Sequence, residues 1–262
     1  MLRSLFTGGT GMRAQKFNVD TISNNLANVN TTGFKKERAD FESLFYEHKK
    51  SPGAPATDAT EHPTGVSVGT GVRTAATQTM HQQGSAKKTD NETDLMIQGD
   101  GFFQVLQEDG TTAYTRDGSF KLDGEGNLVT SNGRFLQPQI QVPQEATSVT
   151  VRSDGTVSAK IPGQADLDQI GQIELAKFVN PSGLQKIGSN LYEETTASGA
   201  PQVLQPGQDG AGQVRQGFLE TSNVNVTQEL TDMISAQRAF EFNQRSIRTS
   251  DQMLSTVTDL IR

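Results

Sequence analysis

The stretch VTQELTDMISAQRAFEFNQRSIRTSDQMLSTVTDLI, residues 226–261, has an apolar residue at every seventh position. These residues are Val226, Met233, Phe240, Ile247, Leu254 and Ile261. The repeat predicts a long helix with one narrow apolar seam, which Leu230 widens near its start. Residues three positions further along are mostly polar or small, so the helix cannot support a globular core alone and is expected to lie in a bundle. Asn223 or Asn225 is the expected N-cap.

Residues 1–33 form a second segment with helical periodicity. Its apolar residues lie seven positions apart, or three positions beyond those, as in a coiled coil. They are Leu5, Met12, Val19, Ile22, Leu26 and Val29. Among the positions that lie three residues beyond the first set, Gly8 and Gln15 interrupt the apolar pattern. Roughly thirty helical residues would span about 45 Å, and Gly33 is the candidate C-cap.

The middle of the chain, residues 95–220, follows a different pattern. Short apolar or alternating runs, such as 102–106 and 173–179, are separated by Asp-Gly and Asn-Gly pairs. Such pairs between β-prone runs are the strongest short-range indication of a hairpin. The middle is therefore predicted to be mainly β, as a hairpin-rich barrel or sandwich.

The predicted fold class is α+β, with two terminal heptad helices forming a coiled-coil domain, a mainly-β middle domain and extended connectors. Residues 46–65 are rich in proline and poor in large apolar groups, and are expected to be a long loop or an extended arm that reaches a neighbouring molecule. The characteristic residues of this arm are Tyr46, Pro52, Gly53, Pro55 and Pro63. The predicted boundaries are 1–33 for the N-terminal helix, 34–79 for the first connector, 80–204 for the β domain, 205–223 for the return connector and 224–262 for the C-terminal helix.

The composition excludes several classes of protein. The chain has 262 residues, a formal net charge of -7 and no cysteine. It therefore has no thiol nucleophile, thiolate metal site or disulfide, and its acidic balance argues against a nucleic-acid partner. No apolar run is long enough for membrane insertion. The first nine residues lack the apolar core of a cleavable signal, so we expect cytoplasmic residence or export by a route that uses no cleaved signal.

No residue pattern indicates catalysis, a cofactor or a metal site. His48, His62 and His81 form no metal-binding motif, and solvated loop residues are the favoured interpretation. The GGTG stretch at 8–11 lacks the lysine of a phosphate loop and is better explained by close helix packing. The loop at Asp123 lacks the full ligand set of a calcium loop and is predicted to be a hairpin turn. Carboxylates are plentiful, but nothing selects a glycosidase-type pair.

The two heptad helices most simply pack against each other, and two arrangements fit. One is an antiparallel stalk within a single chain, carrying a monomeric binding module. The other is a polymer in which terminal helices from many copies bundle side by side. We favour the polymer, because one helical pair would bury too little apolar area to offset the ordering of roughly 65 residues. A periplasmic hydrolase with helical anchoring arms is the enzymatic alternative.

Several motifs in combination resemble those of the bacterial flagellar basal-body rod and hook proteins. The matching stretches are NNLANVNTTGFK at 24–35, IQGDGFF at 97–103, YTRDGSF at 114–120, GNLV at 126–129, ETSNVNV at 220–226 and MISAQRAFE at 233–241. The resemblance covers essentially the whole chain. The signature positions at the two ends are Asn24, Asn25, Leu26, Ala27, Asn28, Thr32, Gly33, Asn223, Gln237 and Arg238.

The resemblance implies a non-enzymatic structural subunit without a cofactor. Copies would polymerise helically into a rigid hollow tube that crosses the periplasm, transmits torque from motor to hook and forms part of the export channel. The implied partners are other copies, proximal rod and hook subunits, the bushing rings, peptidoglycan and the flagellar type III export apparatus, with no nucleic acid. The arm at 46–65 is similar to that of rod members and is implied to block the sliding that lets a hook bend. A proximal rod or hook-type axial subunit is the alternative kind of family member. The sequence departs from the family pattern at Phe240, where many members have tyrosine.

Overall fold

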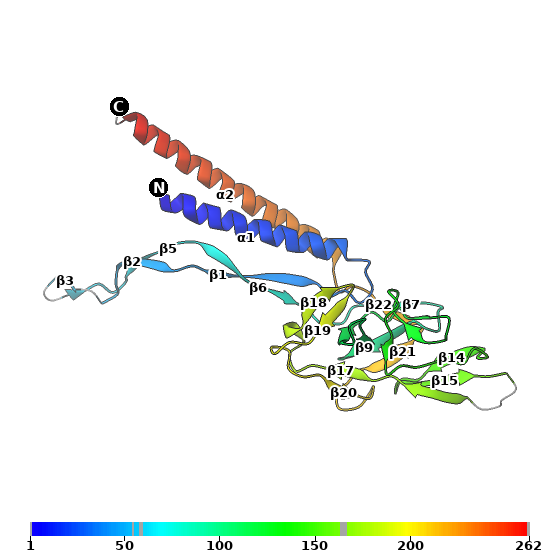
Figure 1. Cartoon of the computed structure of the whole chain (residues 1–262). Helices are drawn as coiled ribbons and strands as arrows, with labels where there is room; N and C mark the ends of the chain where they lie inside the picture. Colours follow the sequence, from blue (N-terminus) through cyan, green and yellow to red (C-terminus); the bar gives the residue numbers. More distant parts are fainter. Residues whose placement is uncertain (1, 54, 58–59, 163–166, 261–262) are drawn as a thin grey trace. The chain divides into compact units, whose positions relative to one another are not determined.

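The structure is a computed structural model, which describes residues 2–53, 55–57, 60–162 and 167–260. Two long helices, α1 (Leu2–Ala27) and α2 (Val226–Leu260), stand near the ends of the chain, and strands fill the sequence between them (Figure 1). The fold class is α+β, as predicted. The chain forms two compact units. The first contains α1 as far as Leu26, Glu37–Gln78 and α2, and the second contains Ala27–Lys36 and Thr79–Val224.

The helix ends match the prediction at one terminus and differ at the other. α1 ends at Ala27, six residues before Gly33, so this glycine is not the C-cap that the sequence indicated. α2 begins as expected, because the Oδ1 of Asn225 accepts a hydrogen bond of 3.2 Å from the backbone N–H of Gln228. Asn225 is therefore the N-cap of the two candidates. Ile261, the last residue of the predicted seam, lies outside the described residues.

The predicted first connector is a ribbon of paired strands rather than a loop. In it, β1 (Glu37–Ser43) pairs with β6 (Val72–Thr79), β2 (Tyr46–Lys50) with β5 (Val66–Gly69), and β3 (Pro55–Thr57) with β4 (Thr60–Glu61). The prolines of the arm do not break these ladders. Pro52 and Pro63 fall between strands and Pro55 is the first residue of one, where no ladder hydrogen bond is lost.

The second unit is built on a seven-stranded sheet. The sheet has the order β18–β19–β10–β9–β17–β20, and β13 also pairs with β9. The strands are β9 (Phe102–Leu106), β10 (Thr112–Thr115), β13 (Leu136–Gln137), β17 (Leu175–Lys177), β18 (Gln185–Gly188), β19 (Leu191–Glu193) and β20 (Gln202–Leu204). β9 and β10 form an antiparallel hairpin around the Asp-Gly pair at 109–110, where Gly110 has a φ of +82°. This is one of the turns that the sequence predicted.

Smaller sheets complete the second unit, which is mainly β as predicted. They pair β14 (Ser148–Val151) with β15 (Thr156–Lys160), β15 with β16 (Asp168–Gln172), β11 (Lys121–Leu122) with β12 (Leu128–Val129), β21 (Gln213–Gln216) with β8 (Leu95–Gln98), and β22 (Phe218–Glu220) with β7 (Ala86–Lys88). A short 3-10 helix, η1 (Pro181–Gly183), lies before β18. β21 and β22 fall within the predicted return connector at 205–223, which is therefore integrated into the second unit by strand pairing.

The apolar core belongs mainly to the second unit. There, Phe103, Val105 and Leu175 are fully buried in a cluster that extends through most of its strands. In the described part of the first unit, the buried apolar residues are Ala14, Ile22, Ala39 and Ala236. Three of these four are alanines, so the first unit buries little apolar surface by itself.

Candidate functional site

α1 and α2 pack antiparallel within the first unit (Figure 1). The hydroxyl oxygens of Ser4 and Ser250 share a hydrogen bond of 3.0 Å near one end of the pair. Near the other end, the Nδ2 of Asn25 donates to the Oε2 of Glu229 at 3.1 Å. Rising residue numbers on α1 therefore meet falling numbers on α2. The antiparallel pairing that the sequence allowed within one chain is present.

Glycines on α1 permit the close approach of the two helices. A Cβ atom at Gly8 would lie 2.8 Å from Cγ1 of Ile247, and one at Gly11 would lie 2.9 Å from Nδ2 of Asn243. These positions and Ser4 are spaced four and three residues apart, so they share one face of the helix. The interpretation of the GGTG stretch as a close-packing site is confirmed for Gly8 and Gly11, whereas a Cβ at Gly9 would meet nothing within 4 Å.

The most buried face of α2 is offset from the predicted apolar seam, although the seam residue Ile247 faces Gly8 of α1. Its buried residues are Glu229, Ala236 and Ser250, which are the small and polar positions of the repeat. The seam residues Met233, Phe240, Ile247 and Leu254 are only half-buried. Val226 and Leu230 are 40% and 43% exposed. On α1, Ile22 is buried, whereas Leu5, Met12, Val19 and Leu26 are half-buried. Val29, also half-buried, lies beyond the end of α1.

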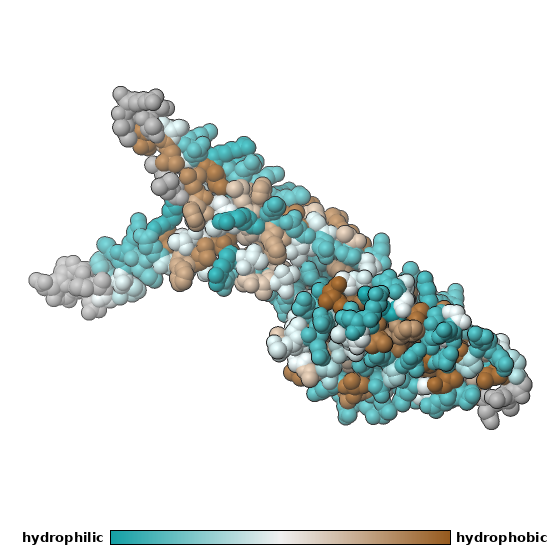
Figure 2. Space-filling model, viewed as in Figure 1, coloured by the Kyte–Doolittle hydropathy of each residue, from teal (hydrophilic) through white to brown (hydrophobic). Residues whose placement is uncertain are grey.

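The helix pair leaves large apolar side chains in solvent. Phe6 on α1 is 69% exposed, and on α2 Ile234 and Phe242 are 51% and 65% exposed. Figure 2 shows apolar surface along the helices, interspersed with polar surface. Apolar groups that alternate with polar ones on a long uncovered helix pair are typical of a surface that packs in a larger assembly.

An open groove runs between the helices on one side. We call it the inter-helix groove. Its lining residues are Lys16, Val19, Gln237, Phe240, Glu241 and Gln244. Its volume is about 530 Å³. Val19 and Phe240 are half-buried and give it an apolar floor, while Lys16 and Glu241 are exposed at its edges.

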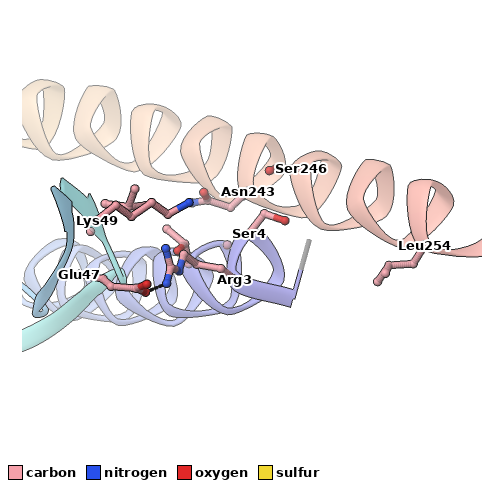
Figure 3. Close-up of a pocket in the computed structure, with 11 residues that line it drawn as sticks. Arg3, Ser4, Glu47, Lys49, Asn243, Ser246 and Leu254 are labelled. Atoms are coloured by element: carbon pink, nitrogen blue, oxygen red, sulfur yellow. Dashed lines mark ion pairs between the residues drawn. The ribbon is translucent and has the colours of Figure 1, made fainter. Parts of the chain in front are cut away.

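A larger polar pocket of about 970 Å³ lies where the ribbon meets both helices (Figure 3). Arg3 of α1 forms an ion pair with Glu47 of β2, and Lys49 points across the pocket toward Asn243 of α2. The two charges of the ion pair offset each other, and both side chains are well exposed. These contacts are therefore best explained as joining the ribbon to the helices.

A second contact fixes the ribbon to α1. The Oγ1 of Thr10 accepts a hydrogen bond of 3.3 Å from the backbone N–H of Val72. A Cβ at Gly71, whose φ is +132°, would lie only 2.2 Å from that same hydroxyl oxygen. Further along the ribbon, the arm residues Tyr46, Pro52, Gly53 and Pro63 are exposed.

In the second unit, a buried ion pair joins the segments that flank the two helices. Lys35 and Glu220 pair directly, with exposed side-chain fractions of 0% and 1%. Lys35 also donates to the carbonyl oxygen of Gln82 at 2.8 Å, and the carboxylate of Glu220 accepts from the N–H of Gly84 at 2.8 Å. Burial lowers the pKa of Lys35, and the negative charge of Glu220 opposes that shift.

Arg116 and His81 extend this buried cluster. The Nη1 of Arg116 lies 3.5 Å from Oε2 of Glu220, and its guanidinium lies 5.3 Å from the centre of the Phe102 ring. The His81 ring packs against Phe102 and Tyr192. Burial, followed by the positive charges of Lys35 and Arg116, lowers the pKa of His81 to about 4. His81 is therefore neutral at pH 7.

The three histidines thus have different surroundings. His48 is exposed and His62 is half-buried on the ribbon. His81 is also half-buried, but its ring packs against Phe102 and Tyr192, so it is not the solvated loop residue that the sequence predicted. No role was predicted for Lys35, Arg116 or Glu220, although each lies in one of the motifs that resemble the rod and hook proteins. A charged residue in a polar stretch carries no sign that it will be buried.

Two signature asparagines hold the backbone where the chain leaves α1 and where it approaches α2. In the first unit, Asn25 donates to the carbonyl oxygen of Glu37 at 2.8 Å and accepts from its N–H at 2.9 Å. In the second, Asn223 donates to the carbonyl oxygen of Met80 at 2.8 Å and accepts from the N–H of Lys36 at 2.8 Å. Of the other signature residues, Gly33 is buried, Leu26, Asn28 and Thr32 are half-buried, and Asn24, Ala27, Gln237 and Arg238 are exposed.

Neither a metal site nor a membrane span emerges from the described residues. No group of three or more His, Cys, Asp or Glu side chains among them is arranged to hold a metal ion. No helix within the described ranges is both long and apolar enough to cross a membrane. At Asp123, the Oδ1 accepts the N–H groups of Glu125 and Asn127 at 2.9 and 2.8 Å, which gives the predicted hairpin turn.

Three families match successive parts of the chain. They are described as "Flagella basal body rod protein" (residues 5–35), "Flagellar hook protein FlgE/F/G D1 domain" (96–159) and "Flagellar basal body rod FlgEFG protein C-terminal" (215–260).

Full-length relatives are similar to the chain from end to end. The flagellar basal-body rod protein FlgG of Borreliella burgdorferi is 50% identical over 264 residues, covering 100% of both chains. Its counterparts in Caulobacter vibrioides and Bacillus subtilis are 44% and 42% identical, covering 99% and 100% of both chains. The solved flagellar hook protein FlgE2 of Helicobacter pylori is 12% identical with a TM-score of 0.25, over 71% of this chain and 43% of that one. That similarity is too low to support a conclusion about the fold.

Proposed function

We propose that this chain forms the distal rod of the bacterial flagellum. It belongs to the family of flagellar basal-body rod and hook proteins and is a structural subunit of the rod. Copies polymerise helically into a rigid hollow shaft that transmits torque from motor to hook and forms part of the export channel. The helices of neighbouring copies bundle as a coiled coil around the channel, and the mainly-β units face outward. The shaft lies in the periplasm, and subunits reach it through the flagellar type III apparatus.

The observation that carries this proposal is the uncovered apolar surface of the helix pair. The pair uses mostly small and polar residues for its internal contact, so Ile234 and Phe242 are left half or more exposed. Such a pair is poorly stabilised by itself and gains stability when other helices cover it. The proposed contacts at the ends of the shaft are with proximal rod and hook subunits, and along its length with the bushing rings and peptidoglycan.

A pair of charge substitutions tests the assembly surface. Phe242→Asp places a charge on the helix face, whereas Val179→Asp places one at an 83% exposed site in the second unit. We expect Phe242→Asp to block polymerisation of the purified protein, because the charge would have to be desolvated between copies. Val179→Asp is expected to polymerise normally. Equal polymer yield from the two variants would contradict the proposal.

The ribbon at 46–65 is proposed to make the shaft rigid. Within this segment Glu47 is tied to α1, and Val72, just beyond it, contacts Thr10 of the same helix. The exposed arm residues Pro52, Gly53 and Pro63 are proposed to contact neighbouring copies and to prevent them from sliding. Deletion of residues 46–65 should therefore give tubes with a shorter persistence length in electron micrographs. Straight and stiff tubes from the deletion variant would show that rigidity arises elsewhere.

We also propose that the subunit has no catalytic role. The buried cluster in the second unit is made of mutually neutralising charges and a neutral histidine, which fits a structural function. The direct test is a peptidoglycan-cleavage assay on purified protein. Release of soluble fragments would reinstate a hydrolase with helical arms.

A further inference from the structure

The most exposed aromatic residue of the first unit is Phe45, which lies between β1 and β2 and is 91% exposed. Its backbone is firmly held. The carbonyl oxygen of Phe45 accepts hydrogen bonds from the N–H and the Oγ1 of Thr70 at 3.1 and 2.7 Å. The N–H of the preceding Leu44 donates to the carbonyl oxygen of Gly71 at 2.8 Å. A rigidly mounted aromatic side chain in solvent is the usual form of an interface anchor.

Within the first unit, the inter-helix groove is the apolar hollow that matches such an anchor. An apolar cavity of roughly 150 Å³ is enough to hold a benzene molecule, and the groove has a volume of about 530 Å³. Its floor includes the half-buried Val19 and Phe240. The groove is therefore large enough to hold a phenylalanine ring.

Phe45 cannot occupy the groove of its own chain. The ribbon is tied to α1 on both sides of Phe45, by the Arg3–Glu47 ion pair and by the hydrogen bond from Val72 to Thr10. These contacts hold Phe45 beside the first ten residues of α1. Val19 lies nine residues beyond Thr10, which is roughly 13 Å along the helix.

The charges beside the anchor and the groove are complementary. Glu42 and Arg73 form an ion pair next to Phe45. Lys16 and Glu241 stand at the edges of the groove, where Glu241 also lies 4.0 Å from Arg245. Each surface thus carries one acidic and one basic side chain, so an orientation exists in which opposite charges face each other across the contact. Exposed pairs of this kind add little affinity but favour one orientation.

We propose that Phe45 of one copy docks into the inter-helix groove of a second copy, and this inference rests on the proposed polymer. The contact joins two different surfaces of the chain, so it is heterologous and generates a ring or an open helical assembly rather than a closed dimer. It deepens the role of the ribbon, because the anchor lies at the root of the arm and not at its proline-rich tip.

Cross-linking tests this contact directly, because the natural chain has no cysteine. One variant carries Phe45→Cys and a second carries Gln237→Cys, which lines the groove. Each is copolymerised as a minor component with the wild-type chain and then oxidised. We expect disulfide-linked dimers between the two variants to exceed, at least five-fold, those between copies of either variant. A matched mixture of Phe6→Cys with Gln237→Cys, using another exposed phenylalanine, should give few dimers.

A polymerisation measurement provides a second readout. Phe45→Ala should raise the concentration needed for tube formation by about ten-fold or more, whereas Phe45→Leu should restore most of the wild-type behaviour. Tyr46→Ala, which removes a neighbouring aromatic side chain that is 54% exposed, should have a small effect. Tubes that form normally but show no preferred Phe45–Gln237 link, or that tolerate Phe45→Ala, would overturn this inference alone. If the wild-type chain forms no tubes, the proposed function itself fails.

Discussion

Lys35 and Glu220 form a fully buried ion pair although 185 positions separate them in the sequence. Lys35 comes from the segment that follows α1, and Glu220 from the end of β22, shortly before α2 begins. The pair therefore holds together the two chain segments through which the second unit continues into the helices. Its burial makes it sensitive to the loss of either partner.

Glu220→Gln should destabilise the second unit strongly. The substitution leaves Lys35 and Arg116 buried without their shared anion, and breaking a buried pair from one side typically costs 3–5 kcal/mol. Denaturant unfolding of the monomer, followed by tyrosine fluorescence, measures the effect. Glu42→Gln removes the partner of Arg73 in an exposed pair and should cost about 1 kcal/mol or less. Similar losses from the two substitutions would contradict the structural role of the buried pair.

His81 should make the stability of the second unit fall in mild acid. Its pKa is about 4 in the folded protein and about 6.5 in an unfolded chain. Between these values the unfolded chain binds a proton that the folded chain does not, so stability decreases as the pH falls through 6.5 toward 4. The contribution of His81 to this loss between pH 7 and pH 5 is about 2 kcal/mol.

Comparing variants isolates that contribution from the carboxylates that titrate in the same range. The difference in unfolding free energy between pH 7 and pH 5 should be smaller in His81→Phe than in the wild type. His48→Gln is the matched control, because His48 lies outside the second unit and its loss should leave the pH response of that unit as in the wild type. An identical pH profile for His81→Phe and the wild type would show that His81 titrates normally.

Gly8 and Gly9 should respond differently to alanine. A Cβ at Gly9 meets nothing within 4 Å, whereas one at Gly8 lies 2.8 Å from Ile247. Gly9→Ala should stabilise α1 by roughly 1 kcal/mol through helix propensity alone. In Gly8→Ala, crowding against α2 offsets this gain, so the net change is near zero or unfavourable. Circular dichroism during thermal unfolding compares the two, and equal stabilisation would mean that the helices do not pack closely there.

Gly33→Ala should be more harmful than Gly110→Ala, although both glycines have positive φ angles of +69° and +82°. Both substitutions strain the backbone by roughly 1–2 kcal/mol. At Gly33 the new Cβ would also lie 2.6 Å from the backbone nitrogen of Asp117, whereas at Gly110 it meets nothing within 4 Å. Chemical denaturation should therefore show a clearly larger loss for Gly33→Ala. Equal losses would mean that the backbone around Asp117 moves freely to accommodate a side chain.

The sequence predicted the existence and type of the main elements well. Seven-residue repeats indicated the two helices, an N-cap at Asn223 or Asn225 was expected for the second, and Asp-Gly turns indicated the β unit. The phase of the contact on α2 was not predicted. Glycines at 8 and 11 let α1 approach Ile247 and Asn243 closely, and the most buried positions of α2 are the small and polar ones. The repeat alone carries no information about such a partner surface.

The ribbon and the buried cluster were not predicted for a different reason. Prolines at 52, 55 and 63 suggested an irregular arm, but they fall between strands or at a strand start, and the pairing of β2 with β5 joins residues on both sides of them. The partners of Lys35 and Arg116 come from distant segments, and no local pattern brings such segments together. These features depend on tertiary contacts.

The most direct test of the central claim is electron microscopy of the purified wild-type protein over a concentration series, with circular dichroism recorded on the same samples. We expect straight tubes above a threshold concentration, together with an increase in helical signal as exposed helix faces become covered. A monomer with fully formed helices and no tubes at any concentration would contradict it.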